Sequence, residues 1–565
     1  MAPARSTVRR STRTLLVAAL AVTALCALQL APAAASPQHR VLRVGAFHGL
    51  AGQFRSIQAA VDAANPGDWI LVAPGDYHEV GSTQAEYPAG VLIETDGIHL
   101  RGMNRNTVIV DGTKRTAAAP CSGDKKDQAL GPIENGHHIG RNGIEVWKAS
   151  GVSIQNLTVC NFLTTPNGDA GNEIWWNGGD GSGKIGMHAY LGSNLTASST
   201  YSNGIGAPFG DYGIFVSNAD GPGLITHTYA NNMGDAAYYI GACPDCNAIL
   251  KDAHGQNSAL GYSGTNSGGH LIIESSEFDH NKTGVTTDSE NNDDVPSPQD
   301  GHCPGTAKGP TGTASCEVWR WNFIHDNNDP DVPGALTGEA GAAPIGTGIV
   351  VAGGRYDTIA HNRITHNDAW GVLIVDDPYQ GAPPPGATCR GGTPGPDDLC
   401  YYQAFGNETA NNLLQHNGGL GNPTNGDLAL AAIPNDPGNC FHGNTDPDGV
   451  TSDPPMIQGP PWDTCGQPNA GDEGPLVAEA LCATQLLFPC PSNPAANYPR
   501  PTKVQLMPIP HEPTMANPCV HVPANPWCPN GAPLGSRGLV RARTTSGSAG
   551  APSDAAGAVA GRREE

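Results

Sequence analysis

A short segment recurs along this chain, in which a small residue is followed by an apolar residue, by any residue and by a second apolar residue. Eight segments fit, at residues 143–146, 186–189, 213–216, 236–239, 259–262, 284–287, 348–351 and 371–374. Most successive segments begin 23 to 27 residues apart, and the two longer separations leave room for insertions near residues 167–184 and 296–316. Self-similarity at a regular period is the signature of a solenoid, in which each repeat forms one coil.

Asparagine marks a second repeated position. An apolar residue stands three places before each of Asn281, Asn327, Asn367 and Asn417. Stacked asparagines can form a ladder of hydrogen bonds at the corner between two strands. Repeats 23 residues apart with such corners fit a parallel β-helix, whose coils stack about 4.8 Å apart. Leucine-rich repeats have a similar period but need a leucine framework that this chain lacks.

Composition and charge narrow the class of protein. Glycine and proline contribute 74 and 49 of the 565 residues, whereas 15% of residues are charged. This composition favours short strands and tight turns over a coiled coil or a helical bundle. The formal net charge is −23, and it becomes −27 without the four arginines of the leader. Such a surface repels phosphates, so nucleic acid is not an expected partner.

The first coil opens with an apolar stripe of helical spacing, formed by Ile57, Ala60, Val61 and Ala64. Together with the repeats, this opening resembles the right-handed parallel β-helix superfamily that includes pectate lyases, pectin esterases and polygalacturonases. The resemblance covers residues 54–417. It implies an all-β fold, a right-handed parallel β-helix of roughly ten coils with an N-terminal capping helix. Six apolar side chains are expected to stack inside it: Ile144, Ile214, Leu260, Val285, Ile349 and Val372.

The chain is expected to divide into four parts. Residues 1–35 have the basic start, the apolar run and the small-residue cleavage pattern of a secretory signal peptide. Residues 36–422 form the β-helix, residues 423–533 form a loop-rich C-terminal cap stapled by disulfides, and residues 534–565 form a disordered tail. Because the apolar run is too short to span a membrane, we expect a secreted, extracellular protein without a membrane segment. We also expect this protein to be a monomer.

Removal of the leader leaves 14 cysteines, an even number that favours disulfides in an exported chain. We expect neighbours in sequence to pair and no thiol to stay free. Cys243 and Cys246 have the spacing of a redox motif, but no βαβ pattern surrounds them, which favours a small staple. The seven expected disulfides are Cys121–Cys160, Cys243–Cys246, Cys303–Cys316, Cys389–Cys400, Cys440–Cys465, Cys482–Cys490 and Cys519–Cys528.

Aligning the repeats predicts which side chains face outward from the coils. One outward column includes Glu145, His188 and Tyr238, and the neighbouring column includes Trp147, Tyr190 and Asp288. Aromatic rings at stacked positions suit sugar rings. The candidate residues for binding a glycan are therefore Glu145, Trp147, Tyr190 and Tyr238.

Carboxylates concentrate in two of these coils. Asp235 directly precedes its strand, as acidic residues do in the polygalacturonases that the chain resembles, and Asp288 and Glu290 follow two coils later. The candidate catalytic residues are Asp235, Asp288 and Glu290 as acids or bases, with His188 as a further proton donor or acceptor. Stacking of the coils would place Asp235 about 10 Å from Asp288.

The acidic segment that contains Asp288 has two other interpretations. Hard oxygen ligands in a loop suit Ca²⁺, and the candidate ligands are Asp288, Glu290, Asp293 and Asp294. The segment also fits an acidic, solvated loop, and a lone histidine such as His188 is more often a surface or turn residue.

Signature segments of individual enzyme families are missing, so no catalytic residue is carried over from a named family. Two functional hypotheses stay open. The first is an exported enzyme that acts on a cell-wall or environmental polysaccharide by hydrolysis or elimination. The second is a glycan-binding or cell-surface protein without catalytic activity. The negative charge disfavours anionic polyuronides as substrates unless Ca²⁺ bridges the two surfaces.

Overall fold

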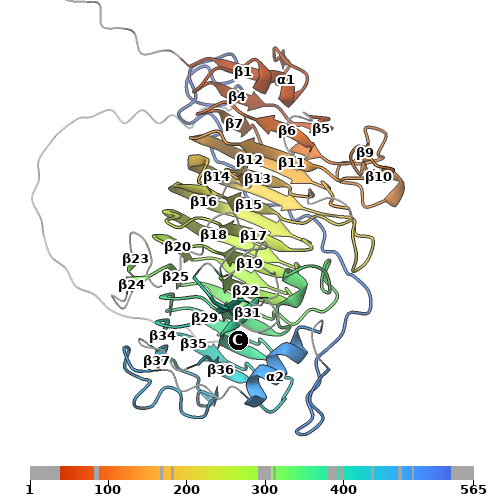
Figure 1. The fold of residues 1–565 in the computed structure, drawn as a ribbon. Coiled ribbons are helices and arrows are strands. Elements are labelled where there is room, and N and C mark those ends of the chain that lie inside the picture. The colour runs from red at the N-terminus through yellow and green to blue at the C-terminus, as the bar shows by residue number, and fades with distance from the viewer. Residues whose placement is uncertain are drawn as a thin grey trace, which may run out of the picture. The chain divides into compact units, whose positions relative to one another are not determined.

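Two long parallel sheets wind together as a right-handed parallel β-helix, which confirms the predicted fold class (Figure 1). This computed structural model describes residues 39–81, 88–165, 170–179, 184–289, 314–379, 391–394, 400–433, 438–468, 474–485 and 489–535, together with residues 307–308 and residue 389. Within that part of the chain, no helix is long and apolar enough to cross a membrane.

The shorter of the two sheets has 11 strands, each paired with the strands of the coils before and after it. In spatial order they are β6 (Ala89–Ile93), β11 (Asn142–Trp147), β13 (Ile174–Asn177), β15 (Ile214–Ser217), β17 (Ala236–Gly241), β19 (Leu260–Thr265), β22 (Thr283–Asp288), β27 (Thr347–Ala352), β30 (Trp370–Val375), β36 (Gly426–Ala431) and β38 (Ser452–Asp453).

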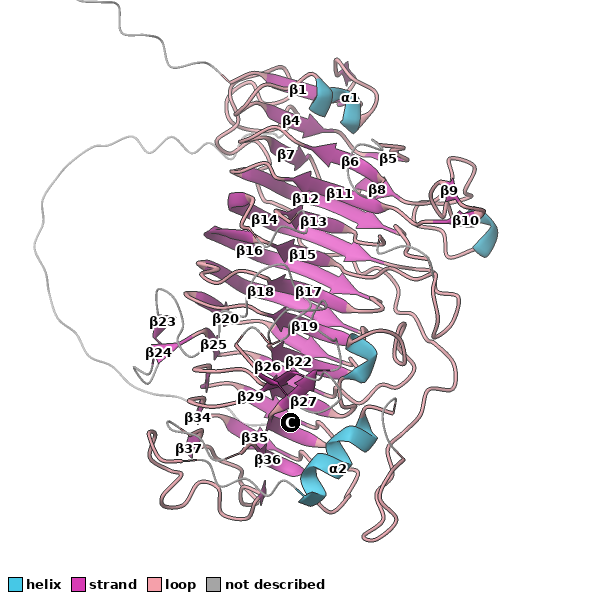
Figure 2. Cartoon of the chain, viewed as in Figure 1, coloured by secondary structure: helices cyan, strands magenta, loops and turns pink. Residues whose placement is uncertain are grey.

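The longer sheet has 18 strands and forms the remaining sides of the coils (Figure 2). Its strands are β1 (Val41–Val44), β4 (Trp69–Val72), β5 (Gly75–Tyr77), β7 (His99–Gly102), β8 (Val108–Asp111), β12 (Val152–Cys160), β14 (Met187–Ser198), β16 (Ala219–Asn231), β18 (Ala248–Gln256), β20 (Leu271–Glu274), β21 (Glu277–Asp279), β25 (Glu317–Arg320), β26 (Phe323–His325), β28 (Thr358–Ala360), β29 (Arg363–Thr365), β34 (Glu408–Ala410), β35 (Leu413–Gln415) and β37 (Cys440–His442).

The other elements are short. They are the helices α1 (Ile57–Asp62) and α2 (Gly474–Ala483), the 3-10 turns η1 (Lys125–Asp127) and η2 (Ala340–Ala342), and the small-sheet strands β2 (Ala46–Phe47), β3 (Leu50–Ala51), β9 (Ile133–Glu134), β10 (His137–His138), β23 (Ala307–Lys308), β24 (Ala314–Ser315), β31 (Asp377–Tyr379), β32 (Thr393–Pro394) and β33 (Cys400–Tyr402).

Helix α1 forms at the predicted apolar stripe. The hydroxyl of Ser56 caps it by accepting a hydrogen bond from the backbone N–H of Ala59 at 3.2 Å. Ile57, Ala60 and Val61 are buried, and the helix packs against β1, β4 and β6. It therefore adds an apolar face to the first coils of the β-helix.

A column of apolar side chains runs through the core under the 11-stranded sheet. The strand pairing stacks Ile144, Ile174, Ile214, Tyr238, Tyr262, Val285, Ile349, Val372 and Leu428 in successive coils. All six side chains predicted to be inside are buried. However, Leu260 lies outside this column, in a separate cluster with Ala236 and Ala340, because it pairs with the first residues of β17 and β22.

The predicted asparagine ladder is confirmed. Asn281 Nδ2 donates to Asn327 Oδ1 at 2.9 Å, Asn327 Nδ2 donates to Asn367 Oδ1 at 3.0 Å, and Asn367 Nδ2 donates to Asn417 Oδ1 at 3.2 Å. A second ladder occupies another corner and joins Asn322, Asn362, Asn412 and Asn444 at 2.8 to 3.0 Å. These ladders fix the register of neighbouring coils from the inside.

The parallel pairing continues beyond residue 422, the predicted end of the β-helix, because β36 pairs in parallel with β30 and β38 pairs with β36. The region after it is loop-rich, as predicted, but its last part does not stay at the C-terminal end. Gln505 and Thr514 contact Asn257 and Asn156 on successively earlier coils, and Trp527 packs against Phe47 near the N-terminal end (Figure 1). This return segment runs back along the outside of the coils.

Six of the seven expected disulfides are present: Cys121–Cys160, Cys243–Cys246, Cys389–Cys400, Cys440–Cys465, Cys482–Cys490 and Cys519–Cys528. Cys316 is also disulfide-bonded, whereas Cys303 lies outside the described residues. The predicted signal peptide and residues 536–565 of the predicted tail lie outside them as well.

Candidate functional site

The outward face of the 11-stranded sheet carries a pair of stacked aspartates. Asp211 and Asp235 stand just before β15 and β17. The backbone N–H of Asp235 donates to the carbonyl of Asp211 at 3.1 Å, so the two residues occupy successive rungs. Adjacent parallel rungs lie about 4.8 Å apart, which brings these two positions alongside each other. Tyr212, the next residue after Asp211, forms a side-chain hydrogen bond with Asp235.

The surroundings of Asp235 favour its protonated form. Burial raises the pKa of Asp235 well above its usual value, and the charges of Asp211, Glu339 and Asp288 add to this effect, while the hydrogen bond with Tyr212 opposes it. Burial and the charges of Asp235 and Asp211 also raise the pKa of Tyr212, so its hydroxyl keeps its proton. The protonated form of Asp235 would place a proton donor directly beside the second carboxyl group, that of Asp211.

A row of aromatic rings lies beside the two aspartates. Trp175 stacks on Phe215 with ring centroids 4.8 Å apart, and Tyr212 stacks on Phe215 at 4.3 Å. Tyr239, on the next coil, meets Phe215 edge-on at 4.8 Å. Trp175 Nε1 donates to Ser217 Oγ at 3.0 Å, which fixes the indole ring. Trp175, Tyr212 and Phe215 are partly exposed, so this row offers an aromatic platform to a ligand.

A loop between β26 and β27 borders the aspartates. Gly334 has a φ of +65° and comes so close to Gly234 that a Cβ atom on it would lie 1.8 Å from the carbonyl oxygen of Gly234. The buried Lys282 holds the same loop by donating to two of its carbonyls at 3.0 and 2.5 Å. The loop carries Glu339, whose charge contributes to the raised pKa of Asp235.

Asp288 belongs to the same electrostatic cluster but stands at the far end of its strand, as the last residue of β22. It is half-buried, and its charge raises the pKa of both Asp235 and Asp377. The predicted separation of Asp235 and Asp288 stays a prediction. Three further residues of the predicted catalytic and calcium-binding sites lie outside the described residues: Glu290, Asp293 and Asp294.

The predicted outward position of Tyr238 is wrong. Tyr238 pairs with Ile214 and Tyr262 and points into the core, where it is buried. Residues 236 and 237 are both alanine, so the small residue of this repeat was ambiguous. A shift of one residue exchanges the two faces of a strand, and Tyr239 therefore takes the outward place.

His188 and Tyr190 do not lie on this sheet, because both belong to β14 of the 18-stranded sheet. His188 is exposed and hydrogen-bonds Asp220 through Nδ1, whereas Tyr190 is buried in the core. The repeat alignment missed β13, because Glu173 stands directly before this strand, where a small residue was expected. Trp175 occupies the outward position that had been assigned to His188.

Glu145 and Trp147 lie in β11, as predicted. Glu145 is 1% exposed, and its two carboxylate oxygens accept hydrogen bonds from Asn142 Nδ2 and Asn177 Nδ2, both at 3.0 Å. The protein itself thus satisfies this carboxylate. Trp147 is half-buried, with Lys148 Nζ 5.1 Å from its ring centroid.

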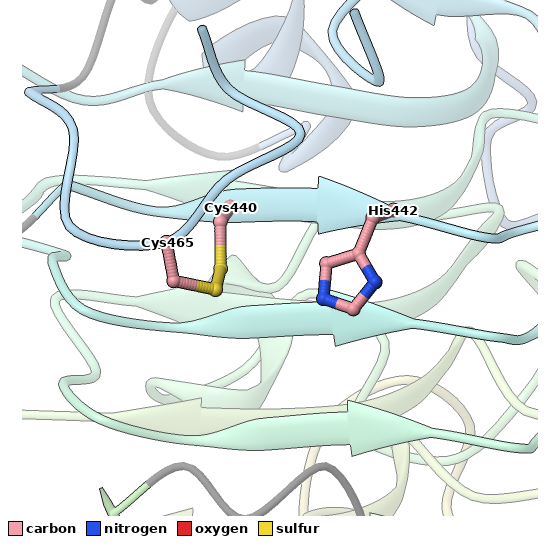
Figure 3. Close-up of side chains that lie close together, drawn as sticks. All are labelled: Cys440, His442 and Cys465. Carbon is pink, nitrogen blue, oxygen red and sulfur yellow. A yellow bond between two sulfur atoms is a disulfide. The ribbon is translucent and has the colours of Figure 1, made fainter. Parts of the chain in front are cut away.

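Residues that could hold a metal ion gather elsewhere on the described chain. Figure 3 shows Cys440 and Cys465 beside His442, but the two sulfur atoms form a disulfide and offer no thiolate. His442 Nε2 lies 2.9 Å from Glu408 Oε1 instead. The cluster of Asp111 with the Cys121–Cys160 disulfide is unsuitable for the same reason. Two clusters without cysteine remain: Asp76, His78 and Asp111, and His254, Glu277 and Asp279.

Four residues of this site were not predicted from the sequence: Asp211, Tyr212, Trp175 and Tyr239. A signal for Asp211 exists, because an aspartate stands two residues before Gly213 just as Asp235 stands two residues before Ala237. Correct alignment of these two repeats would have revealed the stacked pair. Tyr212 and Trp175 had no such signal, since residues of many kinds occupy the matching positions of other coils.

No known family model matches this chain, and no curated protein matches it. Among solved structures, it is similar to the A-module of mannuronan C-5 epimerase AlgE4 from Azotobacter vinelandii, with 14% identity and a TM-score of 0.38 over 70% of this chain and 87% of that one. It is also similar to a mannuronic acid-specific polysaccharide family 6 lyase from human gut microbiota, with 13% identity and a TM-score of 0.37 over 72% and 82% of the two chains. A third is the tailspike protein of E. coli bacteriophage HK620, with 10% identity and a TM-score of 0.32 over 73% and 56%.

Proposed function

We propose that this chain binds a polysaccharide along the outward face of the 11-stranded sheet and hydrolyses a glycosidic bond there. The observation that carries the proposal is the stacked pair of Asp211 and Asp235 beside the aromatic row of Trp175, Phe215 and Tyr212. Aromatic faces bind sugar rings, and a pair of carboxyl groups supplies the acid and the second carboxylate that glycoside hydrolysis needs. The proposed localisation is extracellular, because disulfides persist outside the cell.

In the proposed mechanism, Asp235 donates its proton to the leaving-group oxygen, because burial and the neighbouring charges raise its pKa and favour its protonated form. Asp211, on the neighbouring rung, attacks the anomeric carbon from the opposite face of the sugar while the glycosidic bond breaks. Water, deprotonated by Asp235, then releases the sugar from Asp211. Retaining enzymes hold their two carboxyl groups about 5–5.5 Å apart, which is close to the spacing of adjacent rungs. Retention of the anomeric configuration is therefore expected.

The charge of the site favours hydrolysis of a neutral glycan. The charges of Asp211, Asp288 and Glu339 all act on Asp235, and they repel an anionic sugar. Elimination on a uronate needs positive charge close to the sugar carboxylate, and these residues supply none. Polyuronides are accordingly expected to be poor substrates.

The test is a panel of neutral and acidic polysaccharides assayed for released reducing ends and for the ultraviolet absorbance of unsaturated products. We expect reducing ends from a neutral glycan without unsaturated products. Asp235→Asn should lower kcat by about 10²–10⁴-fold with binding retained. Asp245→Asn, which changes an exposed aspartate paired with His270, is the matched control and should leave kcat unchanged.

The alternative of a non-catalytic glycan-binding protein predicts a different result. No glycan would then be cleaved, while Trp175→Ala and Phe215→Ala would weaken glycan binding by about tenfold or more each. Asp235→Asn with unchanged turnover would remove Asp235 from the mechanism. Inverted products would point to a partner for Asp235 more distant than Asp211.

A further inference from the structure

A cluster of histidines and carboxylates lies on the 18-stranded sheet, away from the aspartate pair. His254 comes from β18, Glu277 and Asp279 come from β21, and His325 comes from β26. The strand pairing places His254 beside Glu277 and places Asp279 beside His325 on consecutive coils. Four side chains from three coils therefore converge on one patch.

The potential ligand atoms already lie close together. One ligand atom each from His254, Glu277 and Asp279 lies within 4.8 Å of the others. His254 Nε2 is 2.5 Å from Asp279 Oδ1, and His325 Nε2 is 3.1 Å from Glu277 Oε1. A tetrahedral ion with bonds of about 2.0–2.2 Å separates its ligand atoms by roughly 3.4 Å. Small rotations of these side chains would satisfy that spacing.

Neighbouring groups orient the same atoms. His325 Nδ1 lies 2.7 Å from Asp326 Oδ2, which turns Nε2 toward Glu277. The other oxygen of Asp279 contacts His280 Nδ1 and, at 3.2 Å, Gln256 Nε2, which leaves Oδ1 for the His254 side. Hydrogen bonds of this kind behind a ligand are typical of protein metal sites.

The four side chains differ in their exposure to solvent. Asp279 has 6% of its side chain exposed and His325 has 12%, whereas His254 has 32% and Glu277 has 44%. The patch is thus anchored in the sheet and open on its outer side.

We infer that His254, Glu277, Asp279 and His325 form a binding site for a divalent transition-metal ion, for which Zn²⁺ is the probe. Two imidazole nitrogens and two carboxylates match the ligand preferences of Zn²⁺, whereas Ca²⁺ and Mg²⁺ prefer oxygen ligands alone. The bound ion would crosslink three successive coils, through β18, β21 and β26. This site is independent of the proposed hydrolysis, because none of its residues belongs to the 11-stranded sheet.

Isothermal titration calorimetry of the untagged chain with Zn²⁺ tests the inference. We expect one equivalent of Zn²⁺ to bind at pH 7.5, at least about 100-fold more tightly than Ca²⁺. His254→Ala and Asp279→Asn should abolish binding, and Asp326→Asn should weaken it by about tenfold or more. The matched control is His270→Ala, which removes an exposed histidine that is also paired with an aspartate, Asp245, and should leave binding unchanged.

Circular dichroism shows whether each variant is folded. If His254→Ala or Asp279→Asn fails to fold, Glu277→Gln replaces it, because the half-exposed Glu277 side chain can change without leaving a buried charge. Full Zn²⁺ affinity in a folded His254→Ala or Glu277→Gln variant would overturn the inference. Equal affinity for Ca²⁺ and Zn²⁺, or the absence of stoichiometric binding, would overturn it as well.

Discussion

Replacing Asn327 by alanine tests what holds the coils in register. The Asn327 side chain is fully buried and takes part in four hydrogen bonds. Its Oδ1 accepts from the backbone N–H and the Nδ2 of Asn281, at 3.3 and 2.9 Å, and its Nδ2 donates to the carbonyl of Phe278 and to Asn367 Oδ1, at 3.1 and 3.0 Å. Alanine removes all four hydrogen bonds, and several of the buried partner groups then lack a hydrogen-bond partner.

The expected cost follows from that count. A buried hydrogen bond contributes about 1 kcal/mol net, and a buried group left without a partner costs about 1–3 kcal/mol. Because Asn281 Nδ2 keeps its bond to Gly255 and Asn367 Oδ1 keeps its bond from the backbone N–H of residue 327, we take the lower end for those two groups. Asn327→Ala should therefore lower the free energy of unfolding by about 4 kcal/mol.

Asn328→Ala is the matched control. Its Nδ2 donates to the carbonyl of His366 at 2.8 Å and its Oδ1 accepts from the backbone N–H of Asp368 at 2.7 Å, but Asn328 is partly exposed, so water can replace the side chain. The expected cost is below about 1 kcal/mol.

Denaturant unfolding followed by circular dichroism measures both variants. Native-state hydrogen exchange at Asn281 and Asn367 reports local opening, since repeat proteins do not always unfold in one step. A difference between Asn327→Ala and Asn328→Ala of less than about 1 kcal/mol, with unchanged exchange at both amides, would refute the idea that the ladder fixes the register.

Four further predictions follow from the same structure. Activity should fall as pH rises through the raised pKa of Asp235. Glu339→Gln removes a charge that raises this pKa, so in that variant activity should fall at a lower pH, and a pH–kcat profile measures both effects. Burial raises the pKa of Asp357 to about 8, so the folded state holds a proton that the unfolded state releases. The free energy of unfolding should therefore decline as pH rises from about 4 to 8, and thermal unfolding of Asp357→Asn should show a weaker decline. Trp527→Ala should loosen the return segment, because Trp527 is fully buried and its Nε1 donates to the carbonyl of Leu50 at 3.1 Å; limited proteolysis should cut residues 500–535 faster while the circular dichroism of the β-helix persists. Thiol titration of the denatured, unreduced protein without its leader, which contains Cys26, should find no free thiol. Two or more thiols would contradict the pairing of neighbouring cysteines.

The sequence predicted the fold because its strongest constraints act on the inside of the coils. Each coil must bury apolar side chains in the same column, so Ile144, Ile214, Val285, Ile349 and Val372 could be recognised from their spacing. The asparagine corners are equally constrained, since an unpaired buried amide is costly. The extension to β36 and β38 was missed because the segments before them do not repeat the spacing.

The outward residues were harder to predict because nothing inside the coil constrains them. An error of one residue at residues 236–237 was enough to exchange Tyr238 with Tyr239. One unrecognised strand, β13, moved His188 to another sheet and hid Trp175. Asp235 was selected because an acidic residue directly before a strand is a local signal, which does not depend on the alignment of distant coils. Its catalytic role stays a prediction.

One geometric property of the β-helix underlies both proposed sites. Neighbouring coils place matching outward positions about 4.8 Å apart, which is the distance at which two carboxyl groups alter each other's pKa and at which side chains can share an ion. Asp211 and Asp235 use this spacing at the edge of one sheet, and His254 and Glu277 use it on the other. The inner column and the asparagine ladders fix the register of neighbouring coils, and this one register positions the outward residues on both sheets. A change in the core that shifts the register of one coil should therefore disturb whichever outward pair spans that coil, whereas a change to either outward pair should leave the other pair intact.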